Sequence, residues 1–289
     1  MAMSFGVSVP NFGVHASRKA IVDVAQAADE LGYDVIWVAE RLLVPEPPNQ
    51  DWSQVDPNAY EPLLTLGFLA GLTQRVKLGT SILIAPFRNP LVLARQTAAL
   101  DQFSQGRLIL GLGLGWMDEE FAATGVPMSQ RGARTDEMIT LLRQVWTNSR
   151  PSFSGRFTQF GESHIEPKPV QAHMPIWIGG NSDAALRRVA RLGDGWTPTG
   201  LDDQQLVERI EFLRQAVAEQ QRPLDEIVVS CNTVFNGAAA VGRTIEALRN
   251  YQNLGVSHFH PSFNFDAVDE LIDQMKVFAV EVMPEVSDQ

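Results

Sequence analysis

The chain has 289 residues, of which 45% are hydrophobic and 20% are charged, and these values are ordinary for a globular protein. Its formal net charge of −11 and the lack of any basic run argue against nucleic acid as a partner, because a phosphate backbone selects clustered Lys and Arg. The single cysteine, Cys231, excludes an internal disulfide, and the five scattered histidines lack the spacing of a zinc site, so we expect no metal.

The start of the chain, Met1 to Ser4, leads directly into a strand-like segment without the basic region of a signal peptide. The sequence also contains no apolar run of membrane-spanning length. We therefore expect a cytoplasmic protein with no membrane contact. The length allows one large domain or two small ones.

Eight short apolar segments, rich in β-branched residues, are expected as strands that alternate with helices. The strands are expected near 5–9, 35–39, 76–84, 107–111, 175–179, 194–198, 227–233 and 257–262. The helices are expected near 18–31, 60–72, 90–103, 203–220, 241–253 and 266–283. This alternation favours one parallel (β/α)8 TIM barrel over residues 1–289 rather than two Rossmann halves.

Two insertions interrupt the regular spacing, one after strand 2 and one after strand 4. Residues 41–57 contain four prolines and are expected as a lid-like loop. Residues 116–174 are expected to hold a helix at about 129–147 and a hairpin at 153–160 with its tight turn at Ser154-Gly155. Both insertions leave from the strand ends where barrel enzymes assemble their sites, although a purely structural cover is the alternative.

The segment 95–121 runs from a helix through an apolar strand into the glycines Gly111, Gly113 and Gly115. It is a near miss for a dinucleotide-binding fingerprint, because the third glycine comes one place too early and Trp116 takes the sixth position. We expect the alternate glycines to let a flat ligand approach the backbone.

A second glycine turn, Gly179-Gly180-Asn181-Ser182, follows an apolar strand and precedes a helix. Successive backbone N–H groups at such a helix N-terminus converge on one point and bind anions. The alternative is an ordinary tight turn in which Asn181 or Ser182 caps the helix. Arg131 and Arg134, in the second insertion, also have two interpretations: they bind an anionic ligand, or they pair with the carboxylates of Asp136 and Glu137.

Histidines offer few candidates for proton transfer. His258 and His260 lie two residues apart in the last strand and so share one face, where His260 is a candidate proton donor or a packing residue. His164, in the second insertion, has the same two interpretations. Three polar residues before strand 4 are expected to hold the helix to the strand: Asp101, Ser104 and Arg107.

Taken together and in order, the motifs resemble the bacterial luciferase superfamily, which comprises luciferase-like monooxygenases and their flavin- or deazaflavin-dependent relatives. The resemblance covers nearly the whole chain and rests on residues 31–40, 78–83, 95–107, 111–121, 175–182 and 194–196. Residues 129–137 and Trp146, ahead of the hairpin, are similar to the branch of oxidoreductases that use coenzyme F420, a 5-deazaflavin, although several relatives use FMN.

The resemblance implies a cofactor site at the carboxyl ends of the strands. It implies that the glycine turn binds the cofactor phosphate, and that a bulge with a non-proline cis peptide at Ser81-Ile82 supports the ring. Asn11 would face the ring from strand 1, and Trp116 and His164 are the candidates for the substrate pocket. The full set of expected cofactor contacts is Asn11, Thr80, Ser81, Ile82, Gly113, Gly179, Gly180, Asn181, Gly195 and Trp196.

The candidate catalytic residues are Glu40, Arg41 and His260. Relatives often carry a histidine after the acidic residue, where this chain has Arg41. Arginine stays protonated and cannot act as a general base, so Arg41 can only orient or stabilise an anion. Trp116 stands where the sugar-phosphate dehydrogenases of the family carry a glutamate, so glucose 6-phosphate is not an expected substrate.

The expected function is F420-dependent hydride transfer between the deazaflavin and a small organic substrate. One alternative is an FMN-dependent monooxygenase that uses O2 and reduced flavin from a separate reductase. Another is a non-catalytic flavin-binding protein, suggested by the missing histidine and the bulky Trp116. A carboxylate-pair hydrolase needs two acids at opposed strand ends, and only Glu40 qualifies. The resemblance also implies a homodimer that pairs through helices beside strands 2 and 3.

Overall fold

The computed structural model of the protein describes residues 3–46 and 56–287. Its main sheet closes on itself, because β3 pairs with both β2 and β5, and every pairing in it is parallel. In chain order the strands of this sheet are β1 Ser4–Ser8, β2 Val35–Val38, β3 Lys77–Thr80, β4 Leu83–Ile84, β5 Leu108–Gly113, β8 Ile176–Gly179, β9 Gly195–Thr197, β10 Val228–Phe235 and β11 His258–Phe263.

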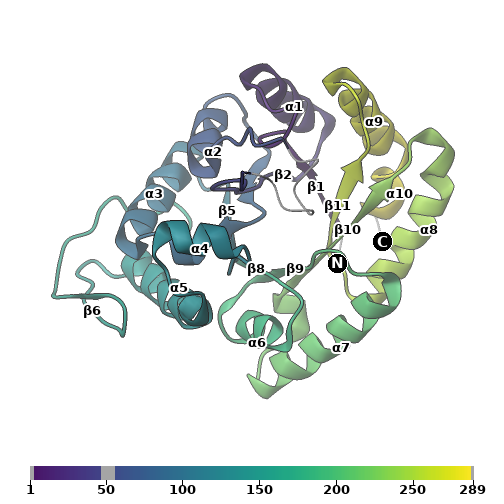
Figure 1. Ribbon diagram of the computed structural model, residues 1–289. Helices are drawn as coiled ribbons and strands as arrows, with labels where there is room; N and C mark the ends of the chain where they lie inside the picture. The colour runs from purple at the N-terminus through teal and green to yellow at the C-terminus, as the bar shows by residue number, and fades with distance from the viewer. Residues whose placement is uncertain (1–2, 47–55, 288–289) are drawn as a thin grey trace.

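Helices form an outer ring around this barrel (Figure 1). They are α1 Arg18–Leu31, α2 Pro62–Ala70, α3 Pro90–Phe103, α5 Arg131–Thr147, α6 Asp183–Leu192, α7 Asp203–Glu219, α8 Val241–Leu254, α9 Val268–Glu281 and the short α10 Pro284–Ser287. The (β/α)8 prediction is confirmed. Within the described ranges, none of the helices has the length and apolar character needed to cross a membrane.

The expected third strand, 76–84, is divided in two by Ser81 and Ile82. β3 pairs with β2 and β5, whereas β4 pairs further along β5, with Leu83 opposite Leu112. The Ser81–Ile82 peptide bond between them is cis, as the family resemblance implied. The interruption lies at the carboxyl end of the strand and therefore at the barrel mouth.

The first insertion is described only at its two ends. Residues 41–46 form no helix or strand, and the rest of the expected lid-like loop, 47–55, lies outside the described residues. Where the chain resumes, Ala59 forms an isolated antiparallel bridge with Phe12, just after β1. The end of the insertion is thereby fixed to the barrel mouth.

The second insertion contains the expected helix and hairpin, together with a helix that the sequence did not predict, α4 Asp118–Thr124. The hairpin pairs β6 Phe153–Ser154 with β7 Gln159–Phe160. The predicted tight turn at Ser154-Gly155 is wrong, because Ser154 pairs with Gln159 and the connection is Gly155 to Thr158. The cause is Glu137 of α5, whose carboxylate accepts the N–H groups of residues 156, 157 and 158 at 2.6–3.0 Å.

Two tryptophans fill the interior of the barrel below its mouth. Trp37 of β2 and Trp177 of β8 lie with ring centroids 5.0 Å apart. Three glycines on neighbouring strands make room for them: a Cβ added at Gly6 or Gly79 would overlap the Trp37 ring, and one at Gly195 would lie 2.6 Å from Trp177. These three positions therefore require glycine, because any side chain would overlap a tryptophan.

We predict that Gly79→Ala destabilises the protein, because the new methyl group cannot enter the barrel without moving Trp37. Overpacking of this kind costs about 2 kcal/mol of unfolding free energy. Urea unfolding measures the loss. The matched control is Gly242→Ala in α8, where a Cβ meets nothing within 4 Å and the helix gains up to about 1 kcal/mol. Equal stability of the two variants would contradict this packing.

Candidate functional site

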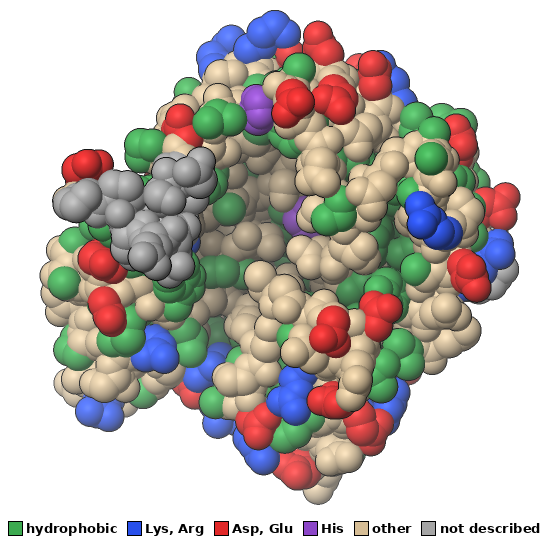
Figure 2. Space-filling model, turned by 45° about the vertical axis from the view of Figure 1, so that its right-hand side comes forward, with side chains coloured by type: hydrophobic (Ala, Val, Ile, Leu, Met, Phe, Trp, Pro, Cys, Tyr) green, Lys and Arg blue, Asp and Glu red, His purple; other side chains and the backbone are tan. Residues whose placement is uncertain are grey.

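The carboxyl ends of the strands open into two adjoining cavities at the barrel mouth, and Figure 2 shows the hollow from one side. The larger cavity, about 500 Å³, lies over the ends of β2, β4, β5, β8 and β9. The smaller cavity, about 290 Å³, lies over the ends of β1 and β11. Ala39, just after β2, lines both and marks the boundary between them.

The floor of the larger cavity is built from the interruption between β3 and β4. The Ile82 side chain lies over Gly113 of β5, where an added Cβ would overlap it, and over Gly179 of β8, where one would lie 3.1 Å away. Below it, the Thr80 hydroxyl donates to the Gly111 carbonyl at 2.7 Å and accepts its N–H at 2.9 Å. Ser81, Ile82 and Gly113 line the cavity.

This packing gives the glycines of the 95–121 segment a second role beside the expected approach of a ligand. At Gly111 a side chain would overlap the Thr80 carbonyl. Thr80, which was expected to contact the cofactor, is fully buried and supports the floor of the cavity from beneath. At Gly113 the Ile82 side chain occupies the space that a Cβ would fill. Gly111 therefore makes room for the third strand, while Gly113 and Gly115 line the larger cavity directly.

The turn Gly179–Ser182 forms the far wall of the larger cavity. Gly180 has φ +114°, a conformation that favours glycine, and the Ser182 hydroxyl caps α6 by accepting the Ala185 N–H at 3.2 Å. Gly179, Gly180 and Ser182 line the cavity, and so does Arg131 at the start of α5. Backbone donors, a helix N-terminus and a guanidinium thus border one space, which is the chemistry of an anion site.

Of three other residues expected to contact the cofactor, Asn181 and Trp196 hold this turn in place. The Asn181 amide donates to the Thr199 carbonyl at 2.6 Å and accepts its N–H at 3.2 Å, which ties the loops after β8 and β9 together. Trp196 is buried and donates its indole N–H to the Gly180 carbonyl at 2.9 Å. Gly195 lies deeper, against Trp177. None of the three lines the cavity.

Glu40, a candidate catalytic residue, is committed to a buried ion pair with Arg88. Its carboxylate also accepts the N–H of Ile84 in β4, and Arg88 bridges to Glu61 at 2.8 Å. Burial raises the pKa of Glu40, while the Arg88 guanidinium and the Ile84 N–H oppose that rise. Glu40 lines the larger cavity, but these bonds make it a positioning residue for β4.

Arg41 and Trp116 form a wall of the same cavity. The Arg41 guanidinium lies 5.3 Å from the Trp116 ring centre and donates to Glu120 at 3.0 Å. The Glu120 side chain is fully buried in α4 and also accepts the Leu42 N–H at 2.8 Å. Sequence reasoning missed Glu120 because α4 itself was not expected. Its acidic first turn, Asp118 to Glu120, was the available signal.

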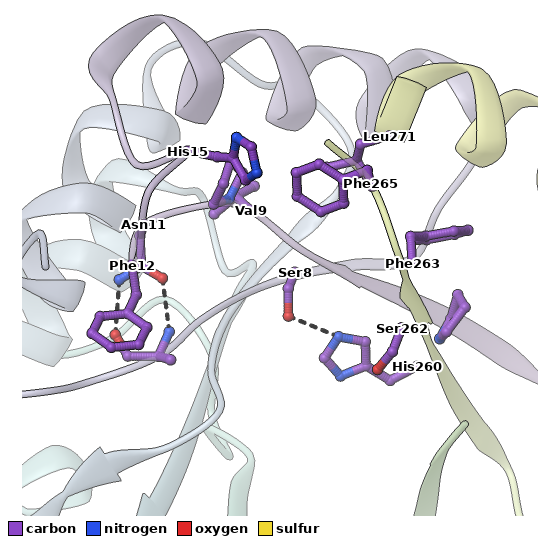
Figure 3. Close-up of a pocket in the computed structure, with 13 residues that line it drawn as sticks. Ser8, Val9, Asn11, Phe12, His15, His260, Ser262, Phe263, Phe265 and Leu271 are labelled. Atoms are coloured by element: carbon purple, nitrogen blue, oxygen red, sulfur yellow. Dashed lines mark hydrogen bonds between the residues drawn. The ribbon is translucent and has the colours of Figure 1, made fainter. Parts of the chain in front are cut away.

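The smaller cavity contains His260, with its Nε2 2.9 Å from the Ser8 hydroxyl (Figure 3). Removal from water lowers the pKa of His260 to about 4, so the ring is neutral at pH 7. Asn11 also borders this cavity, but its amide is bonded to both backbone groups of Ala39 and to the Tyr60 carbonyl. The Asn11 side chain therefore joins the ends of β1 and β2.

His258, two residues before His260, belongs to the barrel floor. It is fully buried, its Nε2 accepts the Trp37 indole N–H at 3.2 Å, and its Nδ1 lies 2.8 Å from the Ser4 hydroxyl. Burial, and after it the neighbouring His260 and Lys77, hold the pKa of His258 well below its usual range. His258 is a packing residue.

His164 does not reach the barrel mouth. It lines a separate groove beside α3, with Leu91 and Arg95. The chain on either side runs outside the barrel, where the Lys168 carbonyl accepts from Gln102 of α3 and the Lys168 ammonium donates to the Val145 carbonyl of α5. The predicted place of His164 in the substrate pocket is therefore wrong.

The polar residues expected to be structural do hold the joint before β5. The Arg107 guanidinium donates to the carbonyls of Ala70, Thr73 and Val76 at 2.8–3.0 Å. Asp101 accepts from the backbone and side chain of Gln171. The two arginines of α5 differ: Arg131 faces the larger cavity, whereas Arg134 lies 4.4 Å from the Phe157 ring centre.

The smaller cavity also contains residues that the sequence did not single out. His15, in the loop after β1, and Phe265, in the loop after β11, have ring centroids 4.9 Å apart. Phe12 and Phe263 line the same space (Figure 3). All four follow or end a barrel strand. The available signal was therefore the presence of aromatic side chains at the carboxyl ends of the predicted strands.

These features define a class of protein: a parallel (β/α)8 barrel with a glycine turn at a helix N-terminus and a divided cavity at its mouth. The model of the luciferase-like monooxygenase family matches residues 3–272, and the chain belongs to that family of oxidoreductases.

Individual relatives differ in the cofactor their names state. The chain is 27% identical over 287 residues to an F420-dependent glucose-6-phosphate dehydrogenase of Amycolatopsis mediterranei, which covers 96% of this chain and 82% of the relative. An F420-dependent secondary alcohol dehydrogenase, solved with an F420-acetone adduct, has a TM-score of 0.83, with 17% identity and full coverage of both chains. The FMN-bound oxygenating component of a Pseudomonas putida Baeyer-Villiger monooxygenase has a TM-score of 0.75 and 17% identity over 99% of each chain.

We predict that Arg88→Met destabilises the protein by about 3 kcal/mol or more at pH 8, because it leaves a buried Glu40 carboxylate without its cation. The loss is expected to shrink at pH 5. A pKa raised in the folded state means that folding favours proton uptake, so stability is retained at low pH and lost as the pH rises through the folded pKa.

Urea unfolding at both pH values measures the effect. Arg150→Met is the matched control, because Arg150 pairs with Glu162 on the surface, where both side chains are about two-thirds exposed, and such pairs contribute at most about 1 kcal/mol. A loss for Arg88→Met that is equally small, or that grows at pH 5, is the result that contradicts the assignment.

Proposed function

We propose that this protein is an F420-dependent oxidoreductase that transfers a hydride between the deazaflavin and a small organic substrate. The observation that carries the proposal is the larger cavity, which places the Gly179–Ser182 turn and Arg131 at one side and the Ser81–Ile82 floor at another. The names of the F420-dependent relatives support it. When bound, the deazaflavin supplies the hydride chemistry, and the protein supplies position and electrostatics.

The residues of the larger cavity fit such a cofactor. The backbone N–H groups of the turn and the N-terminus of α6 favour a phosphate, and the Arg131 charge adds to that field. The Ile82 side chain offers an apolar surface to a flat ring, and its own position is fixed by Gly113 and Gly179. Gly180 keeps this wall open, since its φ of +114° disfavours any side chain there.

Arg41 and Trp116 border the ring end of the same space. Arg41 keeps its charge at all physiological pH values, so it stabilises negative charge on a ligand and exchanges no proton. The buried Glu120 and the Trp116 ring hold the guanidinium in one place. A fixed cation at the cavity wall favours the anionic form of a reduced cofactor or of a substrate oxygen.

A second candidate function uses FMN in place of F420. It is favoured by the similarity of the barrel to the FMN-bound monooxygenase component, and by the nearly equal shape of the two rings. In that case a separate reductase supplies reduced FMN, and O2 is the second substrate. Oxygen uptake with reduced FMN and without F420 distinguishes this function from hydride transfer.

We predict that the purified protein binds F420 with a micromolar Kd, measured by titration alongside FMN. Arg131→Met is expected to weaken cofactor binding about tenfold, because a charge-assisted contact to the phosphate contributes roughly 1.5 kcal/mol. Arg134→Met, on the same helix but stacked on Phe157, is the matched control and retains the wild-type Kd.

Failure to bind either cofactor at micromolar concentration overturns the proposal. Binding without turnover of a panel of alcohols, aldehydes and enones instead identifies the protein as a non-catalytic cofactor-binding relative.

We further propose that the protein forms a homodimer through α2. This helix lies beside β2 and β3. Four apolar residues at intervals of four are exposed along α2 and just beyond its ends: Leu64 and Phe68 in the helix, Tyr60 before it and Leu72 after it. An apolar stripe along one helix face is typical of an interface between protein subunits.

We predict that Leu64→Asp converts the dimer into a monomer, because it places a charge in the middle of this stripe, where Leu64 is 75% exposed. Light scattering after gel filtration measures the mass. The matched control is Val280→Asp on α9, where the side chain is 71% exposed and lies outside the stripe. A wild-type mass of one chain rules out the dimer.

A further inference from the structure

We propose that the smaller cavity binds the substrate, and that this substrate is an uncharged, apolar compound with one or two rings and a hydroxyl or carbonyl oxygen. The inference rests on the proposed function, because it places the substrate beside the cofactor cavity. It adds the substrate class, which the family relationship leaves open, and it assigns the site to the ends of β1 and β11.

The walls of the smaller cavity are apolar and largely aromatic. Phe12, Phe263 and Phe265 line it, and the His15 ring is tilted against Phe265 with the ring centroids 4.9 Å apart (Figure 3). Leu271 of α9 lies at the outer side. Flat side chains on several sides favour a flat, apolar ligand, because rings pack against rings in offset or edge-to-face arrangements.

The volume of the cavity limits the size of the ligand. A cavity of about 150 Å³ holds a benzene molecule. The smaller cavity, at about 290 Å³, therefore has room for one substituted ring or two small rings. Longer chains or sugars with several hydroxyl groups do not match its size and its few polar groups.

Few polar side chains line the smaller cavity: Ser8, Asn11, Ser262 and the imidazoles of His15 and His260. The Asn11 amide is already bonded to Ala39 and Tyr60, so it offers little to a substrate. Ser8 and His260 form one hydrogen bond with each other and face the cavity from neighbouring strands. Each retains further donor or acceptor capacity. With its low pKa, the His260 ring is neutral at pH 7 and binds an oxygen by hydrogen bonding rather than by charge.

The two cavities differ in charge, and this difference decides the class of substrate. The larger cavity is bordered by Glu40, Arg41 and Arg131, whereas no Asp, Glu, Lys or Arg is found among the described residues that line the smaller one. A sugar phosphate or a carboxylate in the smaller cavity would lose its hydration without gaining a Lys or Arg partner, which is costly. Ala39, common to both cavities, places a ligand of the smaller cavity next to the larger one.

The test measures binding directly, on the full chain, by saturation-transfer NMR of three probes: benzyl alcohol, toluene and glucose 6-phosphate. Benzyl alcohol is expected to bind most tightly, toluene more weakly, and glucose 6-phosphate not at all. His260→Phe and Ser8→Ala are each expected to weaken benzyl alcohol about fivefold, the effect of losing one hydrogen bond, and to leave toluene unchanged. His164→Phe, at a histidine outside the barrel mouth, is the matched control with no effect.

Cofactor titration of the same proteins separates this inference from the proposed function. Unchanged cofactor Kd values in His260→Phe and Ser8→Ala, together with weaker benzyl alcohol binding, support the inference. Absence of benzyl alcohol binding in a wild-type protein that binds its cofactor overturns the inference and leaves the proposed function standing. Equal weakening of cofactor and probe, or preferential binding of glucose 6-phosphate, also overturns it.

Discussion

The packing of Trp37 against Trp177 inside the barrel is the constraint on which the rest of the structure depends, because it leaves no room for another side chain in that layer. The two indoles close the barrel only because Gly6, Gly79 and Gly195 carry no side chain toward them. His258 then completes this layer by accepting the Trp37 N–H. Both cavities lie above this layer, at the carboxyl ends of the strands.

The same use of glycine recurs one layer higher, with Ile82 in place of the tryptophans. Gly113 and Gly179 receive its side chain, and this contact sets the floor of the larger cavity against the Gly179–Ser182 turn. Charged groups border that cavity, while neutral and aromatic groups border its neighbour. We propose that this division gives the barrel mouth two chemistries: electrostatic retention of a phosphate-bearing cofactor in the larger cavity, and apolar retention of a small ring compound in the smaller one.

Local pattern predicted the barrel well because each strand is an apolar segment bounded by a helix, as in Val35–Val38 and Ile176–Gly179. The glycine turn was also found, since its donors are consecutive in the chain. The sequence did not predict pairings between distant segments. Glu40 pairs with Arg88, 48 positions away, and Arg41 pairs with Glu120, 79 positions away. Those contacts, rather than residue type, turn Glu40 from a candidate catalytic acid into a positioning residue, and a chain path outside the barrel removes His164 from the site.

A crystal structure of the protein with its bound cofactor tests the central claim most directly. The account predicts that the phosphate lies at the Gly179–Ser182 turn beside Arg131, and that the ring rests on Ile82 in the larger cavity. The smaller cavity is then left open to the substrate. A phosphate bound away from this turn, or a ring seated among Phe12, Phe263 and Phe265, would contradict it.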